Sequence, residues 1–196
     1  PEFHPRVWHF DLEWNTDRDN PFTTVMAVAD SHSDENVVFA WRPNITTPRE
    51  RYVDREGGYI LFEFGSEADE PERLSPLGKV FKPFKDGGYK DTQQPIKGRL
   101  CWDSAAHWKS GSGFETLWQK SGRGQVPNRK LATFAELLDL GSKLTDEIEG
   151  MTVHNGWREY YDDFVDYCLR DTTLLADISE RLNAIEFFVA MQQLCG

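Results

Sequence analysis

The chain has 196 residues, a length sufficient for one domain with its own hydrophobic core. Apolar residues make up 39% and charged residues 28%, and seven Trp and thirteen Phe add large apolar area, so the composition argues against intrinsic disorder. The formal net charge of −11 argues against nucleic-acid binding through a broad basic surface. This negative charge is compatible with a site where bound metal ions offset local carboxylates.

The cysteines and the terminal sequence bear on location. Cys101, Cys168 and Cys195 are scattered, with neither a disulfide framework nor a zinc spacing, which predicts the cytoplasm or another reducing intracellular compartment. The absence of an apolar signal segment predicts that the protein is not secreted, and no apolar run is long enough to suggest a membrane span. Pro1–Phe3 is interpreted as cloning-vector sequence, and residues 4–196 as a single domain.

The first third of the chain is predicted to form a sheet. Turn-forming residues at 30–34 separate two of the predicted strands, and short links between the first three favour an antiparallel meander. The polar segment 42–58 is predicted to be a loop, and the strand after it an edge or crossover strand. The four predicted strands are Arg6–Trp14, Thr23–Asp30, Asn36–Trp41 and Tyr59–Phe64.

The rest of the chain is predicted to be mainly helical, after charged and Gly/Pro-rich connectors at 65–76 and 80–95. Apolar residues recur at helical spacing, and Gly141 suits the end of one helix. Strands followed by helices predict a layered α/β or α+β fold. The predicted elements are a strand at Lys97–Asp103, helical content at Phe114–Gln119, a helix at Leu131–Leu140, a loop at Thr145–Gly156, and helices at Glu159–Leu182 and Ile185–Leu194.

Two carboxylates, Asp11 and Glu13, lie at i and i+2 near the end of the first predicted strand. A strand directs both side chains to the same face. Like charges that close repel unless something positive lies between them, and a divalent cation with oxygen ligands is the simplest partner. The pair therefore indicates a metal site, with solvent-facing polar residues at a strand end as the alternative.

A second group lies on the long C-terminal helix. Tyr167 and Asp171 are at i and i+4, about 40° apart around the helix, so they share a face. The carboxylate is a candidate metal ligand, and the phenol a candidate for orienting an attacking water. Tyr167 as a core aromatic is the alternative. Three other acids of this helix, Asp162, Asp163 and Asp166, are predicted to form a solvated face.

These motifs together resemble the 3′–5′ proofreading exonuclease domain of family B DNA polymerases. Phe10–Glu13 is similar to the first exonuclease motif, and Tyr167–Asp171 to the third motif in its tyrosine variant. The segments Phe62–Glu67, Ile96–Asp103 and Lys130–Lys143 resemble the family's intervening strands and helix. The likeness extends over most of the chain.

The resemblance implies the DEDD exonuclease superfamily and an RNase H-like fold, a mixed sheet flanked by helices. It implies hydrolysis of the 3′-terminal phosphodiester of single-stranded DNA with two Mg²⁺ or Mn²⁺ ions roughly 4 Å apart. Asp11, Glu13 and Asp171 are the implied metal ligands, and Tyr167 the implied partner of the attacking water. A polymerase domain of the same chain is the implied partner in a larger protein.

One family feature has no match. The second motif, Asn-x-x-x-(Phe/Tyr)-Asp, is expected near residues 66–76 and is not found there. Asp162 has the wrong spacing from Asn155 and lies about 180° around the helix from Asp171; Asp103, at a predicted strand end, is a better but weak substitute. The alternatives are a weakened exonuclease-like domain that binds single strands or supports a polymerase, an exoribonuclease of the same superfamily, and a protein-interaction module.

Overall fold

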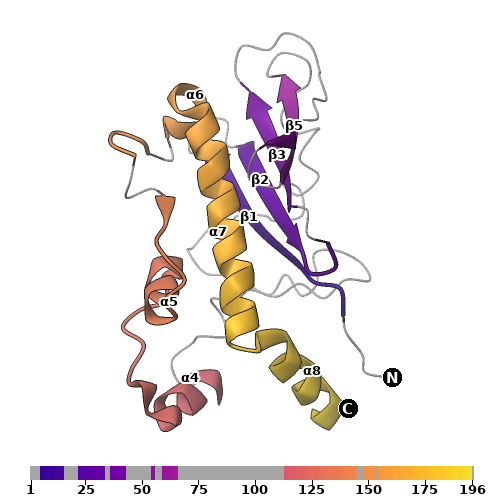
Figure 1. Ribbon diagram of the computed structural model, residues 1–196, viewed down its shortest axis with the longest axis vertical. Coiled ribbons are helices and arrows are strands. Elements are labelled where there is room, and N and C mark those ends of the chain that lie inside the picture. Colours follow the sequence, from indigo (N-terminus) through magenta and orange to yellow (C-terminus); the bar gives the residue numbers. More distant parts are fainter. Residues whose placement is uncertain are drawn as a thin grey trace.

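The computed structural model describes residues 5–15, 22–33, 36–42, 54–55, 59–65, 113–144, 148–152 and 154–195. The labels below are those of Figure 1. The strands are β1 (Trp8–Asn15), β2 (Phe22–Asp30), β3 (Asn36–Arg42), β4 (Asp54–Arg55) and β5 (Tyr59–Gly65). The helices are α4 (Gly113–Trp118), the π-helical η1 (Gln119–Arg123), α5 (Leu131–Leu137), α6 (Gly156–Glu159), α7 (Tyr161–Arg181) and α8 (Ala184–Cys195).

The described strands form one mixed sheet in the order β1-β2-β3-β5-β4. β1, β2 and β3 pair antiparallel, which confirms the predicted meander. β5 pairs parallel with β3, so the segment between them crosses over, as expected for this strand. The two-residue β4 pairs with β5 inside the segment predicted to be only loop, and that expectation was wrong there. The predicted strand Lys97–Asp103 lies outside the described residues.

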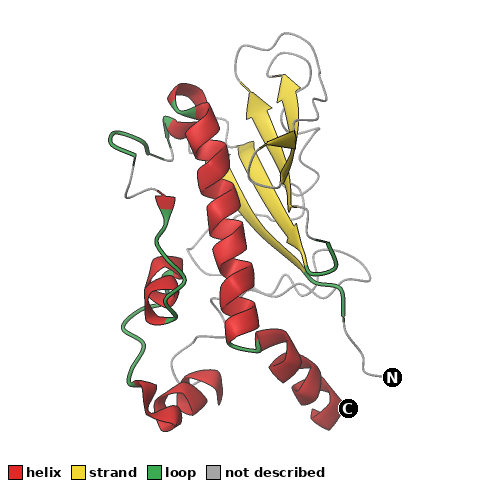
Figure 2. Ribbon diagram, in the orientation of Figure 1, coloured by secondary structure: helices red, strands yellow, loops and turns green. Residues whose placement is uncertain are grey.

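Helix α7 covers one face of the sheet and contacts β1, β2 and β3, as Figure 1 shows. The central strands present small buried residues to it, including Ala27 and Ala40, so the helix backbone approaches closely. The Thr172 hydroxyl donates to the carbonyl of Cys168 at 3.0 Å and lies 3.4 Å from the carbonyl of Ala27. Figure 2 shows the same arrangement by secondary structure, an α/β layering of helices against a mixed sheet.

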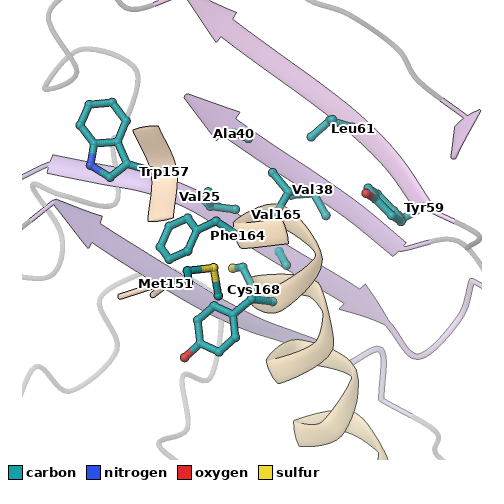
Figure 3. Packing of buried hydrophobic residues seen from close by; sticks show 12 residues of the cluster. Val25, Val38, Ala40, Tyr59, Leu61, Met151, Trp157, Phe164, Val165 and Cys168 are labelled. Carbon is teal, nitrogen blue, oxygen red and sulfur yellow. The ribbon is translucent and has the colours of Figure 1, made fainter. Parts of the chain in front are cut away.

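The main hydrophobic core lies between α7 and the sheet. Figure 3 shows Phe164, Val165 and Cys168 of α7 packed with Val25 and Val38 of the central strands. The buried positions of α7 recur every three to four residues, as the sequence pattern predicted. Burial of each large side chain stabilises the fold by about 1.5–3 kcal/mol. This packing fixes the helix face that carries Tyr167 and Asp171 relative to the strand that carries Asp11 and Glu13.

The C-terminal helices differ from the predicted ones at their ends. The predicted helix Glu159–Leu182 is interrupted at Tyr160, whose φ of −128° and ψ of 43° are not helical, so α6 and α7 are separate. Residue 156, predicted to be in a loop, begins α6. α7 is followed by Asn183 at a φ of 48°, a left-handed conformation that Asn tolerates and that separates it from α8. The predicted helix Leu131–Leu140 ends at Leu137.

Gly156 lies directly against the ring of Phe164 in the core, so a side chain at this position would crowd the core. A Cβ at this position would lie 2.4 Å from the ring of Phe164, which is 1% exposed. We expect Gly156→Ala to lower the free energy of unfolding by roughly 2 kcal/mol through overpacking, measured by urea denaturation. The cost is expected to shrink in a Phe164→Leu background, and an equal cost in both backgrounds would show that the ring is not the cause.

Among the described helices, none combines the length and apolar character needed to cross a membrane.

Candidate metal centre

Strand β1 places Asp11 and Glu13 on the face that α7 covers. In the pairing of β1 with β2, Asp11 lies opposite Ala27 and Glu13 lies opposite Val25, two fully buried residues of that face. Glu13 itself is 8% exposed, so its interpretation as a solvent-facing strand-end residue is wrong. The Cys168 thiol of α7 donates to the backbone carbonyl of Asp11 at 3.7 Å, which ties the helix to this part of the strand. The two carboxylates therefore lie between strand and helix.

Helix α7 brings Tyr167 and Asp171 to the same place. Both are buried, at 7% and 4% exposure, on the face turned to the sheet. The ring of Tyr167 stacks on that of Phe164 with 5.9 Å between centroids, so the core orients the phenol. Tyr167 is thus a core aromatic as well as a neighbour of the acids, and the two interpretations of this residue are compatible.

The three carboxylates predicted as metal ligands meet in space. Asp11, Glu13 and Asp171 each offer an oxygen, and these atoms all lie within 4.8 Å of one another. They come from residues about 160 positions apart in the chain, and the packing of α7 on β1 joins them. The structure thereby brings together all four residues that the sequence analysis selected.

Burial and mutual repulsion shape the protonation of this group. Burial raises the pKa of Asp11, and the neighbouring charge of Asp171 raises it further. Burial, followed by the charges of Asp11 and Asp171, raises the pKa of Glu13 to about 8. The metal-free site therefore holds a proton on Glu13 near neutral pH. A cation entering the site would replace that proton and relieve the repulsion.

The Tyr167 hydroxyl is not a base. Burial raises its pKa well above the usual range, and the negative charges of Glu13 and Asp171 add to the shift. The phenol stays protonated and can donate a hydrogen bond. Such a group can orient a water or a phosphate oxygen, but it cannot remove a proton from one.

The structure adds one residue to the site that the sequence analysis did not select. Lys143, from the segment after α5, donates a hydrogen bond from Nζ to Asp171 Oδ2. The same Nζ lies 5.3 Å from the centre of the Tyr167 ring. A single lysine in a polar segment has no motif or spacing that marks it as part of a site. Only the packing of α5 and its following segment against α7 brings it there.

The residues present fit a divalent cation. All three donors are hard carboxylate oxygens, which suit Mg²⁺ and Mn²⁺. Asp171 Oδ1 is buried and has no hydrogen-bond partner among the described residues, a costly state that a bound cation would relieve. Even with Glu13 protonated, the carboxylates of Asp11 and Asp171 face one ammonium, so the described site keeps a net negative charge that a cation would offset. The triad can hold a metal ion.

The three acids of α7 that were predicted to form a solvated face divide into two kinds. Asp162 and Asp163 are exposed, as predicted for a solvated face. The prediction was wrong for Asp166, which is half-buried and accepts a hydrogen bond from the Tyr59 hydroxyl at 2.7 Å. This bond joins α7 to β5 and serves the fold. Asp103 and the segment where the second family motif was expected lie outside the described residues.

Comparison with known proteins gives no information on the function of this chain. No family model matches the chain, and a search of curated proteins finds no match. The function is therefore argued from the geometry of the carboxylates, Tyr167 and Lys143, together with the sequence motifs that predicted four of these five residues.

Proposed function

We propose that this chain is a metal-dependent 3′–5′ exonuclease domain of the DEDD type, with an RNase H-like fold. The observation that supports it most is the meeting of Asp11 and Glu13 from β1 with Tyr167 and Asp171 from α7. An acidic pair alone is common, and so is a tyrosine four residues before an aspartate. A nuclease that uses an Asp-x-Glu motif together with a Tyr-x-x-x-Asp motif needs the two motifs to meet in one site, as they do here.

The proposed chemistry assigns a role to each residue. Asp11, Glu13 and Asp171 would hold the divalent ions. When bound, these ions supply an activated water and stabilise the charge that develops on the scissile phosphate and the leaving 3′-oxygen. The Tyr167 hydroxyl donates a hydrogen bond that orients the attacking water. The buried walls of the site strengthen these interactions because they exclude bulk solvent.

The proposed substrate is the 3′ end of single-stranded DNA, and the proposed partner is a polymerase domain of the same chain. The similarity of the motifs to those of family B polymerases supports both. The net charge of −11 agrees with recognition of a terminus at a metal site rather than of a long duplex backbone.

The test is an assay of purified protein on a 5′-labelled single-stranded oligonucleotide with Mg²⁺ or Mn²⁺. The proposal predicts a ladder of products shortened one nucleotide at a time from the 3′ end, abolished by a chelator. A chain inert with both metals would contradict an active enzyme. Equal or faster degradation of the matching RNA would favour an exoribonuclease, since the metal ligands do not distinguish deoxyribose from ribose.

A weakened exonuclease-like domain that binds single strands is the second candidate, and two observations favour it. Within the part of the chain that the structure describes, the carboxylate group has three members, where the family motifs supply four. Lys143 already pairs with one of them. This candidate predicts binding of a 3′ end in a mobility-shift assay without release of mononucleotides. Release at a measurable rate with Mg²⁺ would exclude it.

Removal of the Tyr167 hydroxyl separates its two roles. Tyr167→Phe keeps the ring that stacks on Phe164, so we expect little change in stability. Loss of the hydrogen bond to the attacking water should lower kcat by about 10- to 100-fold, with Mn²⁺ affinity within about twofold of wild type. Steady-state kinetics and a Mn²⁺ titration measure the two effects. An unchanged kcat would leave Tyr167 as a core residue only.

A further inference from the structure

Arg170, the residue before Asp171 on α7, clasps the segment that follows α5. Its Nη2 donates a hydrogen bond to the carbonyl of Leu140 at 2.7 Å, and its Nε donates one to the carbonyl of Ser142 at 3.4 Å. One planar guanidinium therefore engages two backbone carbonyls on either side of Gly141. The fork geometry of arginine suits such a bond pair, and lysine cannot reproduce it.

Gly141 is the residue that permits this clasp. Its φ of +89° is strained for any residue with a side chain, and a Cβ there would lie 3.0 Å from Arg170 Nη2. The backbone bend and the close approach of the guanidinium thus occur at the same residue. Gly141 was predicted only to end a helix, whereas α5 ends earlier and Gly141 forms part of this bend.

The two hydrogen bonds of Arg170 hold the backbone next to the acidic site. Lys143 follows Ser142, and its ammonium reaches Asp171, which follows Arg170 on the helix. Adjacent residues of α7 therefore present a metal-ligand carboxylate and hold the segment that delivers its counter-ion. We propose that Arg170 is a positioning residue that sets the cation affinity of the site by holding the Lys143 ammonium against Asp171.

The inference rests on the proposed function only in taking the triad as a cation site. That premise has its own support in the buried, unpartnered Oδ1 of Asp171, a residue 4% exposed. An ammonium bonded to the other oxygen neutralises one unit of the site's charge and occupies a lone pair that a divalent ion would use. Lys143 and the ion therefore compete, and a loosened Lys143 should give tighter binding.

The experiment is a calorimetric titration of the metal-free protein with Mn²⁺ alone, with no substrate. Lys143→Met removes the counter-ion and is expected to lower the Mn²⁺ Kd by about tenfold. Arg170→Lys keeps the charge but loses the fork, and is expected to lower the Kd several-fold. The double variant should bind as Lys143→Met does, because Arg170 acts through Lys143. Arg181→Lys, at the exposed end of α7, is the matched control and should leave the Kd unchanged.

Two results would overturn the role of Arg170. One is a wild-type Mn²⁺ Kd in Arg170→Lys. The other is a decrease in Kd by the same factor when Arg170→Lys is introduced into wild type and into Lys143→Met, which would indicate a long-range charge effect. If Arg170→Lys does not fold, Gly141→Ala displaces the guanidinium from the other side. The same decrease in the Mn²⁺ Kd is expected for this variant, and the same two results would contradict the role of Arg170. Absence of Mn²⁺ binding even in Lys143→Met would contradict the metal site itself and so the proposed function, whereas binding without coupling contradicts this inference alone.

Discussion

Replacing Asp11 with alanine is expected to abolish the proposed nuclease activity while leaving the fold intact. Asp11 is one of the three proposed metal ligands, so the rate of mononucleotide release should fall roughly 10³-fold or more. The metal-free variant should be as stable as wild type or about 1 kcal/mol more stable, since the loss of one half-buried acid relieves its repulsion with Asp171. A gel assay with 5′-labelled DNA and thermal unfolding in a chelator measure the two quantities.

Asp163→Ala is the matched control for this result. Asp163 is an exposed acid in the first turn of α7, outside the carboxylate group, so its loss should leave the rate unchanged and lower stability by at most about 1 kcal/mol. Turnover above a tenth of wild type in Asp11→Ala would place the chemistry elsewhere in the chain. A large loss of stability in the metal-free variant would show that Asp11 supports the fold, contrary to the repulsion argued here.

Glu13 is expected to make the metal-free protein less stable as the pH rises. In the unfolded chain its carboxyl titrates near 4.5, and in the folded chain its pKa is about 8. Between these values the folded state holds a proton that the unfolded state has lost, so the free energy of unfolding falls with increasing pH. The stabilisation is complete below pH 4.5 and is lost as the pH passes about 8. The difference between these two pKa values corresponds to a loss of roughly 5 kcal/mol across this window.

Glu13→Gln should remove most of that slope because the amide is neutral at every pH in the window. Urea denaturation in a chelator at several pH values, with the variant compared to wild type, isolates this contribution from other groups that titrate. Glu136→Gln, at an exposed position of α5, should leave the slope unchanged. Saturating Mg²⁺ should restore the stability of wild type at pH 8 and do less for Glu13→Gln. Parallel curves for wild type and Glu13→Gln would contradict the pKa shift.

The elements that sequence pattern predicted best are those with strong periodicity. β2 and β3 alternate around short turns, and α7 repeats its apolar residues over 21 positions, so their existence and the meander followed from local rules. Element ends were less predictable because they depend on single residues. The interruption at Tyr160 and the left-handed Asn183 leave no signal in the apolar repeat.

The candidate site divides in the same way. Asp11 with Glu13, and Tyr167 with Asp171, were each predictable as pairs because spacing on one strand or one helix fixes a shared face. Lys143 was not, since it reaches the site from a segment without regular structure. Outside the site, the burial of Asp166 was not predictable either, because its bond to Tyr59 depends on a strand more than a hundred residues away. Contacts between distant segments follow from packing, and local spacing does not encode them.

The most direct test of the metal centre is anomalous diffraction from crystals of the protein soaked in Mn²⁺. We expect at least one anomalous peak within coordination distance of oxygens of Asp11, Glu13 and Asp171, with the Lys143 ammonium displaced from Asp171. Crystals that show no peak there while Lys143 stays bonded to Asp171, or that bind Mn²⁺ only at other carboxylates, would contradict it.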